Sequence, residues 1–110
     1  MSISTYKEYF FMEKKYVELK HCFLDMWSEH PEQETCLAFR FSKPNKADIA
    51  RFQATGTKNS TNAMRELLLA LIHEEDRQNF LDTLEEHPGI LITFTNPILA
   101  SSGVSADLGK

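Results

Sequence analysis

The sequence predicts an α+β fold: a mostly helical single domain with a small strand element and a long amphipathic N-terminal helix. Two patterns in the 110 residues carry this prediction. Apolar side chains recur every three or four residues in the N-terminal third, which is typical of one helix face, and residues 37–41 alternate with the period of a strand. The length favours one domain, so we expect it to span residues 1–100, with a flexible C-terminal tail at 101–110.

The N-terminal segment has two competing interpretations. Thr5 and Glu8 form a capping-box pattern, and Pro31 ends a helix before it, so we predict one helix over residues 6–29. Alternatively, 9–12 and 16–19 could pair as a β-meander around residues 13–15, although that turn lacks Gly or Asn. The predicted helix would place six apolar residues on one face: Tyr9, Met12, Tyr16, Leu19, Phe23 and Met26.

The later elements are predicted from alternation, caps and breakers. Leu37, Phe39 and Phe41 form the apolar side of a strand of about six residues, which Pro44 ends. Asn45 can cap the helix that follows, and Pro88 ends a later one. The predicted helices are 45–53, 62–72, 74–86 and a short helical segment within 90–100, with a loop at 55–60.

Charge is segregated along the chain although the net charge is only −4, which excludes a generally basic nucleic-acid coat. The segment 40–65 is positive, and either a solvated surface or a phosphate-binding surface explains it. Neighbouring phenylalanines make single-stranded nucleic acid the alternative partner. The candidate nucleic-acid-binding residues are Arg40, Lys43, Lys46, Arg51 and Lys58.

Cysteine and histidine spacing predicts neither a disulfide framework nor a metal site. Two cysteines, Cys22 and Cys36, are too few for a framework, so we expect two buried thiols. The four histidines and these cysteines match no spacing of a zinc site. We therefore expect no bound metal.

No residue constellation predicts catalysis or a cofactor. Asp82, Glu85 and Glu86 share one side of a predicted helix, where a solvated acidic face explains them. Gly56 and Lys58 lack the earlier glycine and the adjacent Gly-Lys pair of a phosphate loop. We expect no enzymatic activity and no cofactor.

Nothing in the sequence predicts membrane insertion or export. The chain has no run of about 18 apolar residues. Residues 1–5 are not followed by the apolar region and cleavage site of a secretory signal. We expect a cytoplasmic protein with no membrane partner.

The order of signals from residue 37 to residue 103 resembles small tail assembly chaperones of long-tailed bacteriophages and related prophage proteins. The segments that carry this resemblance are Phe39-Arg40-Phe41, Lys43-Pro44, Ala47–Phe52, Ala63-Met64, Leu67–Ile72, Asp76-Arg77, Leu84–Gly89, Pro97–Leu99 and Gly103. Members of this family begin with strands, whereas we predict a helix over residues 6–29.

The resemblance implies a non-catalytic protein in the cytoplasm of a bacterial host cell. Such chaperones cover the long helical tape measure protein until the tail tube polymerises around it. A tape measure protein exposes apolar helical stripes, which an apolar groove or helix face can cover. The candidate contact surfaces are the face from Tyr9 to Met26 and the run Leu67–Ile72, each of which is otherwise explained as core. The aromatic-rich N-terminal segment is also a candidate self-association face.

Overall fold

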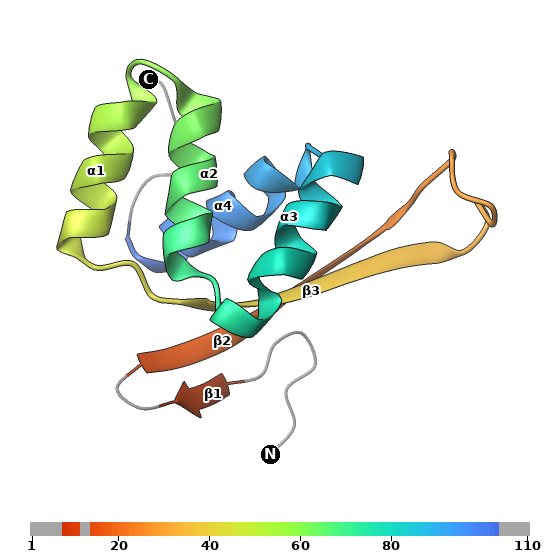
Figure 1. Cartoon of the computed structure of the whole chain (residues 1–110), viewed down its shortest axis with the longest axis horizontal. Helices are drawn as coiled ribbons and strands as arrows, with labels where there is room; N and C mark the ends of the chain where they lie inside the picture. The colour runs from red at the N-terminus through yellow and green to blue at the C-terminus, as the bar shows by residue number, and fades with distance from the viewer. Residues whose placement is uncertain (1–7, 12–13, 104–110) are drawn as a thin grey trace.

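The computed structural model describes residues 8–11 and 14–103, and it confirms the α+β class. Figure 1 shows the helices on one side of an antiparallel sheet, with the β2–β3 hairpin extending beyond α3. The elements are β1 (Glu8–Phe11), β2 (Lys14–Leu24), β3 (Glu34–Ser42), α1 (Lys46–Gly56), α2 (Ser60–Leu71), the 3₁₀ turn η1 (Glu74–Asp76), α3 (Arg77–Glu86) and α4 (Ile90–Ser101).

The prediction of one helix over residues 6–29 is wrong. The alternative β-meander is correct in outline, but Lys14 and Lys15 belong to β2 and not to the turn. β1 pairs with β2, and β2 pairs with β3, both antiparallel. The second pairing joins nine residue pairs, from Tyr16 opposite Ser42 to Leu24 opposite Glu34. This long ladder satisfies the backbone of β2 and packs its side chains, which overrides a local preference for helix. Residues 1–7 and 12–13 of the N-terminal segment lie outside the described residues.

Strand alternation divides β2 between two faces. Leu19 and Phe23 project from the face that the helices cover, together with Phe39 and Phe41 of β3. Tyr16 lies on the opposite face and packs its ring edge-on against His73 at 4.7 Å. β3 extends from Glu34 to Ser42 and is therefore longer than the six residues predicted.

The predicted helices are confirmed, with small changes at their ends. Asn45 and Asp48 form a reciprocal capping box at α1, with hydrogen bonds of 2.8 and 2.9 Å. Asn59 caps α2 by accepting a hydrogen bond from the Asn62 backbone amide. The segment within 90–100 is helix α4, with Pro97 inside it.

The core lies between β3 and the helices and centres on three aromatic rings. Phe39 makes edge-to-face contacts with Phe80 of α3 at 5.2 Å and with Phe94 of α4 at 5.5 Å. Such contacts add about 0.5–1.5 kcal/mol beyond the area they bury. Leu68 and Leu99 complete this centre and are fully buried, so the N-terminal aromatics and C-terminal aliphatics form one core.

The outer edge of β3 is covered near its C-terminal end by the connection between α2 and α3. Ile72 forms a β-bridge with Phe41, and the His73 backbone amide donates to the Arg40 carbonyl at 2.8 Å. Asp76 then accepts three hydrogen bonds from Arg40, one from its backbone amide and two from its guanidinium. The edge of β3 is therefore closed to pairing with another chain at Arg40 and Phe41.

Candidate functional site

The most exposed large apolar side chains gather at the end of the β2–β3 hairpin, which we call the hairpin tip (residues 24–34). Leu24 is 64% exposed, Met26 71% and Trp27 87%. The tip extends beyond the helices in Figure 1, so these side chains have little chance to join the core. Exposed tryptophan and its apolar neighbours are typical of protein-binding surfaces.

The first turn of the tip is ordered by Asp25. Its carboxylate accepts a hydrogen bond from the Trp27 backbone amide at 3.0 Å, and its carbonyl accepts one from Ser28 at 3.1 Å. The same carboxylate lies 3.9 Å from Nε2 of His87, which also packs against the ring of Phe23. Trp27 is therefore presented by a defined turn whose first residue lies next to His87, at the end of α3.

The tip is acidic as well as apolar. Residues 24–34 contain four carboxylates and no lysine or arginine. These carboxylates belong to Asp25, Glu29, Glu32 and Glu34. A surface of this kind favours a partner that presents apolar side chains next to positive charge.

The prediction of two buried thiols is wrong, because Cys22 and Cys36 form a disulfide and Cys36 is exposed. The two residues lie directly opposite each other in the β2–β3 register. This pairing depends on which strands meet, which the spacing of the cysteines alone does not reveal. The bridge cross-links the two strands at the base of the tip.

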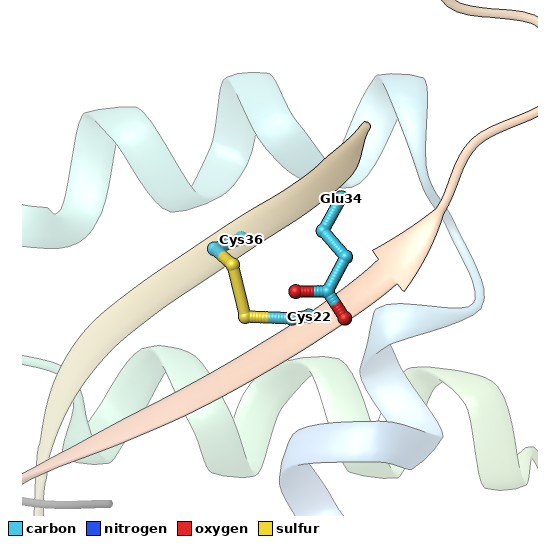
Figure 2. Close-up of side chains that lie close together, drawn as sticks. All are labelled: Cys22, Glu34 and Cys36. Carbon is cyan, nitrogen blue, oxygen red and sulfur yellow. A yellow bond between two sulfur atoms is a disulfide. The ribbon is translucent and has the colours of Figure 1, made fainter. Parts of the chain in front are cut away.

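Glu34 lies beside this disulfide on the same face of the hairpin, as Figure 2 shows. A carboxylate oxygen of Glu34 and the two sulfurs lie within 4.8 Å of one another. Metal ions bind thiolates, and a closed disulfide supplies none. With the bridge closed, the cluster acts as a covalent cross-link next to a carboxylate.

A groove lies at the opposite end of the hairpin, between the sheet and the end of α4. Its volume is about 450 Å³, which is within the range of clefts that hold drug-sized ligands. Lys15 and Lys43 contribute positive charge, and none of its described lining residues is acidic. Its apolar lining consists of Val17, Leu19, Phe41, Pro44, Pro97 and Ile98.

The six predicted partner-binding residues do not form one surface. Leu19 and Phe23 face the helices, whereas Tyr16 is buried against His73 on the other face. Met26 is exposed at the tip. Tyr9 belongs to β1, and Met12 lies outside the described residues. The other predicted surface, Leu67–Ile72, contributes four buried residues to the core.

The five predicted nucleic-acid-binding residues are also spread over the fold. Lys46 and Lys58 lie at opposite ends of α1, which is 11 residues long and therefore about 16 Å. Lys43 lies at the groove, and Arg51 pairs with Asp48 at 2.8 Å. The basic segment therefore forms no compact patch from these side chains.

Arg40 is held by Asp76 within the fold and is not a freely solvated side chain. The side-chain hydrogen bonds to Asp76 raise the pKa of Arg40, against the opposing effect of partial burial. The same hydrogen bonds lower the pKa of Asp76 below its usual value. Both changes favour the charged pair, so the guanidinium is held at the edge of β3.

Leu24 and Trp27 were not among the residues predicted to bind a partner. Their signal is a group of three large apolar side chains, Leu24, Met26 and Trp27, which surround Asp25 and stand directly before an acidic segment that contains Pro31. Apolar residues next to a turn are exposed if the turn extends past the core. That extension follows only from the hairpin pairing.

The helices in the described part of the chain are all too short or too polar to cross a bilayer. No curated protein matches the chain. The fold is similar to the solved structure of an uncharacterised protein, rbstp2171 from Bacillus stearothermophilus, with a TM-score of 0.63 and 22% identity over 84% of this chain and 88% of that chain. The family model of the domain of unknown function DUF6848 matches residues 9–109. The chain therefore belongs to the DUF6848 family.

Proposed function

We propose that the protein is a non-catalytic protein-binding domain and that the hairpin tip is its contact surface. The exposure of Trp27, at 87%, is the observation that carries this proposal. A tryptophan left in water contributes little to folding, whereas its burial at an interface removes a large apolar area from water. The Asp25 turn orders the backbone of Trp27 before a partner arrives, which lowers the ordering cost of binding.

The partner that we propose is the tape measure protein of a phage or prophage. The support is the sequence resemblance over residues 37–103 to tail assembly chaperones, together with an apolar tip able to cover a helical stripe. This function places the protein in the cytoplasm of a bacterial host cell, where most disulfides are kept reduced. The turn that presents Trp27 depends on Asp25 and does not require the bridge.

Co-expression with the tape measure protein encoded in the same genome tests the proposal. The wild-type chain should keep that long helical protein soluble and copurify with it, whereas Trp27→Ser should not. Ile92→Ser is the matched control, because Ile92 is an exposed apolar residue of α4, outside the tip. Equal copurification with all three chains would refute the tip as the contact surface.

The same preparation tests the alternative partner. Nucleic acid that copurifies and is released steeply by salt would contradict the proposal and support the basic segment 40–65. Binding through apolar contacts should persist at high salt. Failure of all three chains to retain the tape measure protein would refute that protein as the partner.

A further inference from the structure

The groove near the start of β2 has the opposite properties to the hairpin tip. It is a recess lined by apolar side chains such as Val17 and Phe41, and Lys15 and Lys43 contribute positive charge. The tip is a projection with apolar side chains at its start and four carboxylates along residues 24–34. The two surfaces are complementary in shape, polarity and sign of charge.

The two surfaces cannot meet within one molecule. Val17 contributes to the groove and Leu24 begins the tip, and both belong to the continuous strand β2. Seven residues of extended strand span roughly 23 Å. β2 is paired with β3 over this whole length, so the hairpin does not fold back on itself.

We propose that the groove binds the hairpin tip of a second copy of this chain. Trp27 would enter the apolar recess, and the tip carboxylates would approach Lys43. Because each molecule carries the tip at one end of the hairpin and the groove at the other, the contact is head-to-tail. Repeated between copies, such a contact either closes reciprocally as a two-fold dimer, with each tip in the groove of the other molecule, or continues as a ring or a chain.

The small area of the contact between tip and groove indicates how strongly two copies should associate. One turn in one groove buries less than the roughly 1,200–2,000 Å² of a standard stable interface. Association should therefore be reversible and depend on protein concentration. It should also weaken as salt rises, because part of the attraction lies between exposed charges.

Complementary variants provide the decisive experiment, read out by sedimentation equilibrium from micromolar to millimolar concentration. The wild-type chain should associate into dimers or larger species as concentration rises. Trp27→Ser removes the tip anchor and keeps the groove, whereas Lys43→Glu reverses charge at the groove and keeps the tip. Both residues are exposed, so both variants should fold, which far-ultraviolet circular dichroism checks. Each variant alone should remain monomeric.

The equimolar mixture of the two variants separates head-to-tail binding from other arrangements. The intact groove of Trp27→Ser can bind the intact tip of Lys43→Glu, so the mixture should form a 1:1 dimer and nothing larger. A wild-type chain that stays monomeric would overturn the inference. A mixture that stays monomeric would also overturn it. That result would favour a tip-to-tip contact, because every mixed pair then lacks Trp27 in one partner. Unchanged association of Lys43→Glu would exclude the groove.

This inference shares the tip with the proposed function, and the variants distinguish the two failures. Lys43→Glu keeps Trp27 and should still bind the tape measure protein, whereas Trp27→Ser should lose both activities. If the wild-type chain binds that protein but remains monomeric alone, only self-association is refuted. If it self-associates but binds no tape measure protein, only the proposed function is refuted.

Discussion

Replacing Asp76 by asparagine should lower the free energy of unfolding by about 2 kcal/mol at neutral pH. The Asp76 carboxylate accepts hydrogen bonds from the Arg40 backbone amide at 2.8 Å, from Nε at 3.0 Å and from Nη2 at 2.8 Å. These bonds fix the start of α3 to the edge of β3. Asparagine keeps the size and one acceptor oxygen, so the substitution removes mainly the charge.

The predicted loss of about 2 kcal/mol follows from the partial burial of the Arg40–Asp76 pair. The Arg40 and Asp76 side chains are 22% and 19% exposed. Exposed ion pairs contribute about 0–1 kcal/mol, whereas removing one partner of a buried pair costs about 3–5 kcal/mol. The partial burial and the two guanidinium bonds of this pair place the cost between these limits, at about 2 kcal/mol.

The cost should also depend on pH with a defined sign. Hydrogen bonds from Arg40 lower the pKa of Asp76 in the folded state. The stabilisation is therefore fully present above the pKa of aspartate in the unfolded chain, about 3.9, and is lost as pH falls through the lower folded pKa. The difference between wild type and Asp76→Asn should be constant from about pH 5 to 7 and should shrink in more acidic solution.

Urea denaturation followed by circular dichroism at several pH values measures these differences. Glu75→Gln is the matched control, because Glu75 is 71% exposed and contacts the same guanidinium at 3.3 Å. It should cost less than about 1 kcal/mol. Equal costs for the two variants at neutral pH would refute the assigned geometry. A cost of Asp76→Asn that stays the same at pH 3 and pH 7 would refute the electrostatic explanation.

Two further predictions concern the cross-link and the core. Reducing the Cys22–Cys36 bridge should lower the free energy of unfolding by about 3 kcal/mol, because the bridge closes a loop across 14 residues. Urea denaturation with and without a phosphine reductant measures this loss. The double serine variant is the control and should not respond to the reductant. Among the described residues, the buried Thr95 hydroxyl lacks a hydrogen-bond partner, so Thr95→Val should raise stability by about 1 kcal/mol. Thr83→Val is its control and should lower thermal stability, since that hydroxyl donates to the Asn79 carbonyl at 2.7 Å.

The helical half of the fold could be predicted because its signals are local. Asn45 and Asp48 stand three residues apart at the start of α1, where each side chain caps the other's backbone. Pro88 and Gly89 separate α3 from α4. The acidic residues 74–76 form the 3₁₀ turn that leads into α3. Signals of this kind act over a few residues and need no knowledge of distant partners.

The N-terminal half could not be predicted in the same way. The apolar residues from Tyr9 to Met26 have helical spacing, and β2 nevertheless pairs with β3 through residues 34–42. The stabilisation of that strand comes from a segment up to 26 residues away, as in the pair Tyr16 and Ser42. The disulfide depends on the same register, and so does the projection of the tip.

The candidate site was predicted only in part for the same reason. Met26 was among the predicted contact residues and is exposed at the tip. Leu24 and Trp27 were not, because their exposure depends on the hairpin extending past α3. Arg40 was a candidate nucleic-acid contact, but Asp76 lies 36 residues along the chain and holds it in place. A charge pattern cannot reveal such a partner.

The hairpin tip is where the requirements of folding and of binding differ most clearly. Burial of Phe39 and Phe80 stabilises the core, whereas Trp27 remains in water and contributes almost no burial. Even so, its turn is held by the Asp25 carboxylate, and that carboxylate lies next to His87 of the helical layer. Order in a segment that adds little to the core is expected where a surface is preorganised for a partner. The same order fixes the backbone from which Trp27 projects relative to the rest of the tip, which favours a specific contact over general apolar adhesion.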